Sequence, residues 1–146
     1  MRHRRDFGAK GRAPERDARS SLPERIRSHP IPPLRDDAIR VIPLGGVEEV
    51  GRNMTAIEFR DAIIVVDIGL QFNDEDTPGI DYILPNTRYL EERKEKIKAV
   101  FITHGHLDHI GGIPYIMPRI GNPPLYTRQF GALMIQKRQE EFPHLP

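Results

Sequence analysis

Short alternations of apolar and polar residues predict that ordered structure begins near Ile39. Three such runs, at residues 40–44, 54–59 and 62–66, have the length and the β-branched content of strands. The pair Arg60-Asp61 separates the second run from the third and suits a tight turn. These two strands should therefore form a hairpin.

The second half of the chain alternates strand-like and helix-like segments. Residues 71–85 are acidic and carry Pro78-Gly79, which indicates a long loop. The segments expected after it are a charged helix capped by Asn86 or Thr87 and ending near residue 96, a buried strand at 99–102, a helix at 113–117, a strand after Pro123-Pro124, and a helix from a Thr127 cap to about residue 141. A hairpin followed by strand–helix alternation predicts an α/β domain with a mixed sheet.

Residues 1–38 differ in composition from the rest. They are rich in Arg and Pro and poor in aromatic residues. Such a segment buries too little apolar area to offset the entropy of ordering, so we expect a disordered basic tail at 1–38 and a folded part at 39–146. The net charge is only +1, but residues 1–40 carry 11 Lys and Arg against 6 Asp and Glu. The arginines could bind nucleic-acid phosphates, or the tail could be a solvated segment without a specific role.

Composition excludes several classes of protein. The length of 146 residues suits one domain, and the absence of cysteine excludes disulfides and thiolate metal ligands. No apolar run is long enough to span a bilayer, and the basic N-terminus lacks the apolar core of a secretory signal. We therefore expect a cytoplasmic protein without a membrane partner.

The densest chemistry follows the predicted strand at 99–102. Here His104, His106, Asp108 and His109 place four strong metal ligands within six residues. In an extended chain residues two apart project to the same side, so His104 and His106 can share one ion. Asp108 and His109 follow where the chain turns toward a helix, and can face a second ion. This spacing disfavours the alternative of histidines scattered by chance in a polar loop.

The chemistry of these side chains narrows the choice of metal. Imidazole and carboxylate ligands without a thiolate favour zinc, with manganese as the second choice. Two adjacent ions could activate a water and stabilise the attacking and leaving oxygens of a phosphodiester. Gly111 and Gly112 would let the backbone pack close to such a site where the helix begins. The motif therefore predicts a two-metal hydrolytic centre.

The metal motif, together with Asp67 at the end of an earlier strand, resembles the metallo-β-lactamase fold. Three further stretches, at 42–54, 66–72 and 79–85, narrow the resemblance to the ribonuclease J family of β-CASP nucleases, over residues 40–141. Leu107 stands where many members carry an acidic residue, although not at a ligand position. The resemblance implies the αββα sandwich of that fold, with only its N-terminal part present in this chain.

The resemblance also implies roles for individual residues. His104 and His106 would bind the first zinc ion, and Asp108 and His109 the second, with Asp108 and His109 acting in catalysis. Asp67 would brace the metal loop by hydrogen bonding, or could simply cap a turn at its strand end. The residues expected to shape the loop beside the cleft, or to be ordinary turn formers, are Gly45, Gly46 and Asn53. His3, His29 and His144 match no motif and are interpreted as incidental surface residues.

Part of the family's site has no counterpart in this sequence. The family continues with a later His, a metal-bridging Asp and a final His beyond the β-CASP insertion. After His109 this chain has one His, His144, and no Asp. We therefore expect the N-terminal portion of a longer protein, inactive by itself, with the remaining ligands outside this chain.

The resulting functional hypothesis is a zinc-dependent ribonuclease. The resemblance implies hydrolysis of RNA in the 5′-to-3′ direction, with endonucleolytic cleavage left open, and a homo-oligomeric full-length protein. No residue is assigned to RNA binding. One alternative is another metallo-β-lactamase-fold hydrolase, acting on thioesters or small phosphodiesters. A second is a non-catalytic fragment that binds RNA through its arginine-rich tail.

Overall fold

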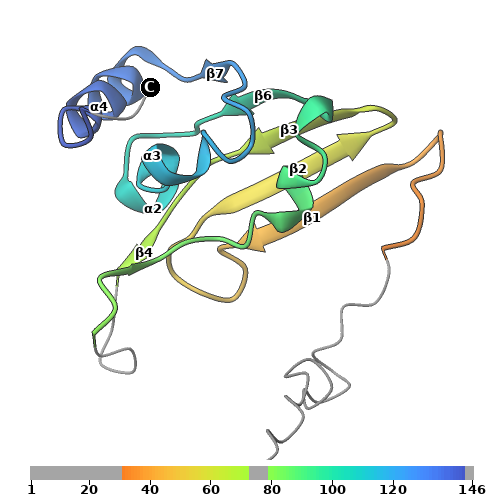
Figure 1. Cartoon of the computed structure of the whole chain (residues 1–146), viewed down its shortest axis with the longest axis horizontal. Coiled ribbons are helices and arrows are strands. Elements are labelled where there is room, and N and C mark those ends of the chain that lie inside the picture. The colour runs from red at the N-terminus through yellow and green to blue at the C-terminus, as the bar shows by residue number, and fades with distance from the viewer. Residues whose placement is uncertain (1–30, 73–78, 144–146) are drawn as a thin grey trace, which may run out of the picture. The chain divides into compact units, whose positions relative to one another are not determined.

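A five-stranded mixed sheet, in the order β1-β2-β3-β6-β7, lies at the centre of the computed structural model, which describes residues 31–72 and 79–143 (Figure 1). The strands β1 (Ile39–Gly45), β2 (Met54–Phe59) and β3 (Ala62–Val66) pair antiparallel. Both β6 (Ile97–Phe101) and β7 (Leu125–Tyr126) add to them in parallel. The predicted α/β class with a mixed sheet is confirmed.

The chain divides into two units, residues 1–33 and residues 34–146. The sheet and all described helices belong to the second unit. The tail predicted at 1–38 lies mostly outside the described residues, so its disorder stays a prediction. His3, His29 and His144 also lie outside them.

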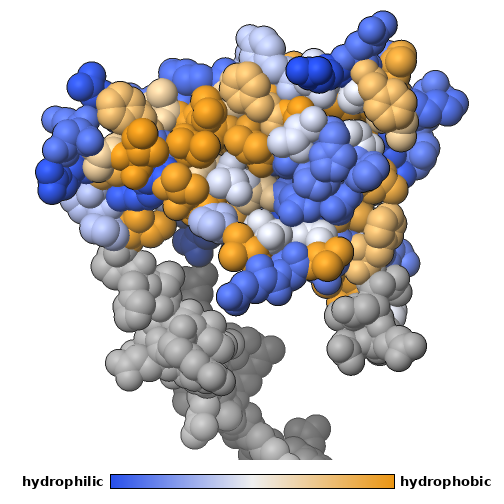
Figure 2. Space-filling view, turned by 180° about the vertical axis from the view of Figure 1, so that it is seen from behind, coloured by the Kyte–Doolittle hydropathy of each residue, from blue (hydrophilic) through white to orange (hydrophobic). Residues whose placement is uncertain are grey.

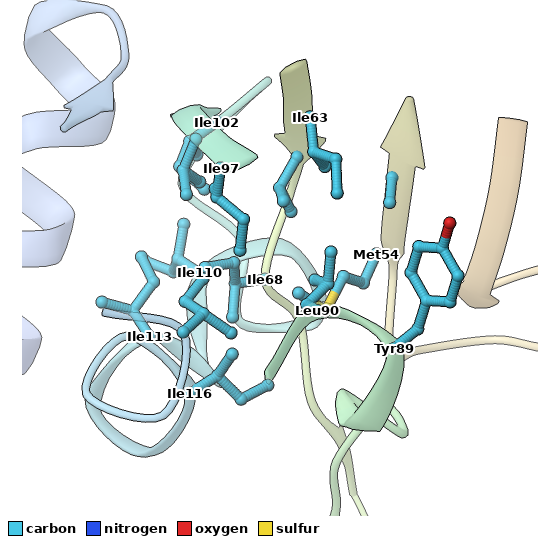
Figure 3. Close-up of a cluster of buried hydrophobic side chains, with 14 residues drawn as sticks. Met54, Ile63, Ile68, Tyr89, Leu90, Ile97, Ile102, Ile110, Ile113 and Ile116 are labelled. Carbon is cyan, nitrogen blue, oxygen red and sulfur yellow. The ribbon is translucent and has the colours of Figure 1, made fainter. Parts of the chain in front are cut away.

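Four short helices cover one face of the sheet: α1 (Arg88–Glu91), the 3₁₀ helix η3 (Lys94–Lys96), α2 (Leu107–Ile110) and α3 (Ile113–Ile116) (Figure 1). Burial alternates along β2 and β3, because every second side chain points toward these helices. The apolar side chains of the two layers point toward one another in Figure 3. The core comprises, among others, Met54, Ile63, Ile68, Leu90, Ile97, Ile102, Ile110, Ile113 and Ile116.

A buried polar contact joins α1 to the sheet. The hydroxyl of Tyr89 donates to the carboxylate of Glu58, which is only 3% exposed. The guanidinium of Arg40 donates to the same carboxylate at 3.1 Å and to the Tyr89 hydroxyl at 3.0 Å. Burial, followed by the bond to Glu58, raises the pKa of Tyr89. A charged residue in the core is thereby paired and hydrogen-bonded.

The opposite face of the sheet is not covered by any described element. Its register places Ile39 beside Phe59, Val66 beside Phe101 and Phe101 beside Tyr126 on this face. Ile39 is 65% exposed, and the stacked rings of Phe101 and Tyr126 have centroids 5.3 Å apart. Figure 2 shows hydrophobic side chains gathered on the side of the molecule opposite to the view of Figure 1. The described residues thus form one helical layer and one sheet layer.

Several element boundaries differ from the sequence predictions. The loop at 71–85 contains two short strands, β4 (Gln71–Phe72) and β5 (Tyr82–Ile83), which pair antiparallel. The single charged helix predicted to residue 96 is broken into α1 and η3, because only its first turn carries side chains that reach the core, Tyr89 and Leu90. The helix α2 was not predicted.

The helical caps also differ in part. The hydroxyl of Thr87 donates to the side chain of Glu91 at 2.6 Å rather than capping α1, whereas the side-chain oxygen of Asn86 accepts the backbone N–H of Arg88 at 3.1 Å. The last helix, α4 (Gln129–Gln139), begins after Arg128. The predicted cap at Thr127 is therefore wrong: its buried hydroxyl oxygen has no hydrogen-bond partner among the described residues.

No helix in the described part of the chain is both long and apolar enough to cross a membrane.

Candidate metal centre

The parallel pairing of β3 with β6 brings two strand ends together. The backbone N–H of Asp67, just after β3, donates to the carbonyl of Phe101 at 2.9 Å. The backbone N–H of Thr103, just after β6, donates to Oδ1 of Asp67 at 2.8 Å. Asp67 has a left-handed backbone with φ of 61°, which is uncommon for a residue other than glycine. This conformation turns its carboxylate toward the metal motif.

Backbone hydrogen bonds join the motif to two earlier segments. The N–H of Ile68 donates to the carbonyl of His109 at 2.8 Å, and that of Gly112 donates to Ile68 at 2.9 Å. The N–H of Asn53 donates to the carbonyl of Asp108 at 3.1 Å, and Gly69 donates to Asn53 at 2.9 Å. The start of β2, the segment after β3 and helix α2 therefore hold one another in place.

The four predicted ligands come together as two neighbouring pairs. Nε2 of His104 lies 3.2 Å from Nδ1 of His106, and both side chains are exposed. Nε2 of His109 lies 3.3 Å from Oδ2 of Asp108, and both side chains are half-buried. The ring centroids of His104 and His109 are 4.0 Å apart, so the pairs adjoin.

The spacing of the donor atoms fits metal binding. Two ligands at about 2.0–2.1 Å from a tetrahedral ion stand about 3.3 Å apart, close to the separation within each pair. Two adjacent cation positions with two protein donors each are therefore compatible with the geometry. Within the residues that the structure describes, no group of three or more His, Cys, Asp or Glu side chains is arranged to hold one ion.

Asp67 lies beneath this cluster and is 5% exposed. Its Oδ2 accepts a hydrogen bond from Nδ1 of His109 at 2.8 Å. Because Nδ1 then carries the proton, Nε2 of His109 keeps a free lone pair on the side of Asp108. Asp67 also accepts hydrogen bonds from the backbone N–H and the hydroxyl of Thr103. Its carboxylate thus contacts three groups of the site, two on Thr103 and one on His109.

Asn53 lies on the other side of the second pair. Its side-chain N–H₂ donates to Oδ2 of Asp108 at 3.0 Å and to the backbone oxygen of Asp108 at 3.1 Å. Nε2 of His109 is 3.3 Å from the same nitrogen. The sequence interpretation assigned Asn53 to the shape of a nearby loop, whereas the structure puts its amide in direct contact with two predicted ligands.

The loop that precedes Asn53 is tightly wound. Gly46, Glu48, Gly51 and Arg52 all have left-handed backbones, with φ between 54° and 98°. The backbone N–H of Gly46 donates to Glu49 at 3.0 Å; this bond and the ion pair with Arg52 lower the pKa of the Glu49 carboxyl.

Two glycines are required by this loop. A Cβ on Gly45 would lie 2.3 Å from the carbonyl oxygen of Arg52. A Cβ on Gly46 would lie 2.3 Å from Oδ1 of Asn53. The absence of side chains at 45 and 46 therefore leaves room for Asn53 to face the metal motif.

Thr103 is the residue at this site that the sequence interpretation missed. Its hydroxyl lies 2.9 Å from Oδ2 of Asp67 and 3.0 Å from Nδ1 of His104. The sequence signal was slight, since a single threonine after a strand is common. Only its place immediately before the first His of the motif could have indicated a role.

Comparison with known proteins places these observations in a family. Residues 47–143 match the metallo-beta-lactamase superfamily. The chain is similar to proteins named ribonuclease J: it is 45% identical over 102 residues to that of Mycoplasma pneumoniae, which covers 70% of this chain and 18% of the relative. It is 44% identical over 110 residues to that of Thermus thermophilus, covering 73% and 19%, and 39% identical over 112 residues to that of Mycolicibacterium smegmatis, covering 77% and 20%.

The resemblance to ribonuclease J inferred from the motifs is thus confirmed, and the matched part spans about a fifth of the length of these relatives. The matched residues 47–143 include most of the wound loop, the metal motif at 104–109 and the whole of α4. Membership of this superfamily implies bound metal ions. The chain belongs to the metallo-β-lactamase superfamily.

Proposed function

We propose that this chain is the N-terminal part of a metal-dependent ribonuclease of the ribonuclease J type. The substrate would be RNA and the reaction hydrolysis of its phosphodiester bonds, in the 5′-to-3′ direction and, as a second mode, at internal positions. Two zinc ions are the proposed cofactors, with manganese as the alternative. The observation that carries the proposal is the pair of donor separations, 3.2 Å and 3.3 Å, in a chain 38–45% identical to ribonucleases J.

Each ion would be held by one pair of side chains. His104 and His106 are the proposed ligands of the first ion, and Asp108 and His109 those of the second. When bound, such ions supply Lewis-acid stabilisation of charge on phosphate oxygens and a nucleophile at neutral pH. Asp67 keeps the proton of His109 on Nδ1, and the side-chain amide of Asn53 holds Asp108 by one hydrogen bond to its carboxylate and one to its backbone oxygen. The further ligands that the family uses would come from other parts of the protein.

The decisive experiment uses the protein expressed from its complete reading frame. It is stripped of metal, reloaded with Zn²⁺ or Mn²⁺, and incubated with RNA labelled at either end and carrying a 5′ monophosphate. Release of mononucleotides from the 5′ end that needs metal and stops on chelation supports the proposal. Internal fragments instead would assign the endonucleolytic mode.

Two other outcomes correspond to the alternatives. Metal-dependent hydrolysis of a thioester or a small phosphodiester, with RNA left intact, would show another hydrolase of this superfamily. RNA binding without cleavage, lost on deletion of the arginine-rich residues 1–38, would show a non-catalytic role. Either result overturns the proposed ribonuclease activity.

A cytoplasmic location is part of the same proposal. A chain without cysteine needs no oxidising compartment to fold, and ribonucleolysis requires access to transcripts. Fractionation of cells that produce the tagged protein tests this point.

A further inference from the structure

The hydroxyl of Thr103 lies between two groups of the metal centre. Its oxygen is 3.0 Å from Oδ1 and 2.9 Å from Oδ2 of Asp67, and 3.0 Å from Nδ1 of His104. Thr103 is an exposed residue just after β6, so it contributes little to the core. The placement of its hydroxyl among polar atoms of the site therefore calls for an explanation other than packing.

Counting donors and acceptors assigns the direction of these bonds. An ionised carboxylate only accepts hydrogen bonds, so the single O–H of Thr103 is donated to Asp67. The Thr103 oxygen then offers only its lone pairs to Nδ1 of His104, which must carry the proton. Neutral His104 is consequently protonated on Nδ1 and free on Nε2, the nitrogen 3.2 Å from Nδ1 of His106.

Asp67 fixes the second histidine in the same way but directly. Its Oδ2 accepts the N–H of His109 at 2.8 Å, which leaves Nε2 of His109 free toward Asp108. One buried carboxylate thus orients both imidazoles, one through Thr103 and one by contact. Partners of this kind fix the protonated nitrogen of a ligating histidine and raise its basicity.

We propose that Thr103 is a positioning residue of the metal centre. Its hydroxyl is hydrogen-bonded to the carboxylate of Asp67 and to Nδ1 of His104, and so holds Nε2 of His104 toward the ion shared with His106. The inference rests on the proposed metal-binding function of the motif, and it names a determinant of that function outside the ligand set. Thr103 contacts neither ion nor substrate in this scheme. Its hydroxyl, rather than its methyl group, is the required part.

The matched variants are Thr103→Val, which keeps the shape and removes the hydroxyl, and Thr103→Ser, which keeps the hydroxyl. The full-length protein is labelled with ¹⁵N-histidine, and the side-chain nitrogen resonances of His104 report which nitrogen carries the proton. Zinc affinity is measured by competition with a chromophoric chelator, without RNA. Circular dichroism and thermal melting monitor the fold of each variant.

We expect Thr103→Val to lose about 10–100-fold in zinc affinity and to give His104 a mixture of the two neutral forms. We expect Thr103→Ser to match the parent protein in both measurements. Equal zinc affinity and an unchanged His104 spectrum in Thr103→Val would overturn the inference. If Thr103→Val fails to fold, Thr103→Ala compared with Thr103→Ser gives the same comparison, and an equal zinc affinity in those two again overturns it.

These measurements separate the inference from the proposed ribonuclease activity. A protein that leaves RNA intact but binds zinc in a Thr103-dependent manner would refute the ribonuclease and retain the positioning role. If the parent protein cleaves RNA and its Thr103→Val variant binds zinc equally well, the ribonuclease proposal is retained and the positioning role is refuted.

Discussion

Single side chains at the proposed metal centre are oriented by hydrogen bonds to one another. Asp67 is the clearest case, because its buried carboxylate accepts the N–H of His109 at 2.8 Å. An amide at this position in the full-length protein lacks the negative charge that favours this bond. We expect Asp67→Asn to lower zinc affinity by about 10–100-fold with little change in helix content. The matched control is Asp61→Asn, in the exposed β2–β3 turn, which should bind zinc like the parent protein.

Removal of a predicted ligand should have a larger effect than Asp67→Asn, and it should appear in the proposed ribonuclease activity. His106→Ala or Asp108→Ala would leave one of the proposed ions with a single donor from its pair, so the proposed ribonuclease activity of the full-length protein should fall to less than about a tenth. Bound metal per chain and the initial rate of RNA cleavage are measured together. His3→Ala, which changes a histidine outside every motif, should retain the full rate. A variant at 106 or 108 that kept both metal content and rate would refute the assigned ligand.

The sequence alone predicted the four candidate ligands but not the residues that contact them. His104, His106, Asp108 and His109 are visible because their spacing is rare and their chemistry is specific. Thr103 and Asn53 are recognised only from contacts between segments distant in sequence. Thr103 meets Asp67 through the register of β3 against β6, and the amide of Asn53 meets Asp108 across the start of β2 and α2. A pattern read along one chain contains no such register.

At the scale of elements, the centre depends on how closely the segment after β3 packs against α2. A Cβ on Gly69 would lie 1.7 Å from the carbonyl oxygen of Asp108 and 2.7 Å from the backbone nitrogen of Asn53. Because both obstacles are backbone atoms, the segments must separate to admit a methyl group. We expect Gly69→Ala to destabilise the full-length protein by about 1–3 kcal/mol and to weaken zinc binding. Urea unfolding and chelator competition measure the two effects.

A second glycine variant provides the control for that change. Gly79 lies in the β4–β5 connection, where an added Cβ would meet none of the described residues within 4 Å, although its φ of 83° is unfavourable for alanine. Gly79→Ala should therefore reduce stability by about 1 kcal/mol through the backbone alone and leave zinc affinity unchanged. Equal zinc affinities in both variants would show that the contact of Gly69 with Asp108 does not position the ligands.

Elements with a clear apolar pattern were predicted well, and elements held by tertiary contacts were not. The strands β1, β2, β3 and β6 carry alternating or continuous apolar residues, and the hairpin turn at 60–61 is where it was expected. The strands β4 and β5 have two residues each, and α2 has four, so neither length nor periodicity could reveal them. The strands β4 and β5 pair across a loop, and the carbonyls of α2 accept the backbone N–H groups of Asn53, Ile68 and Leu70, which lie far away in the sequence.

At the scale of the whole molecule, net positive charge is concentrated in the N-terminal part of the sequence. The tail, residues 1–38, holds ten Lys and Arg against six Asp and Glu. If this segment binds RNA phosphates, its deletion from the full-length protein should weaken RNA affinity most at low salt, and should make the slope of log K against log salt concentration less steep. Titration of fluorescent RNA between about 50 and 200 mM salt measures this. An unchanged slope would assign the tail no part in RNA binding.

The uncovered face of the sheet leads to the last prediction, that the 146-residue chain alone associates and binds zinc weakly. Ile39, Val41 and Phe101 expose 65%, 60% and 43% of their surface on this face, and exposed apolar patches favour association.

The two proposed ligand pairs supply two protein donors per ion, where a catalytic zinc has three. Light scattering and zinc titration of the isolated chain test both points. Val41→Lys should reduce association of the isolated chain. It should also destabilise the full-length protein, in which we expect the second half of the sandwich to bury the same face. A monomeric isolated chain that binds two zinc ions tightly, or a full-length protein indifferent to Val41→Lys, would show that the described residues form a self-sufficient domain.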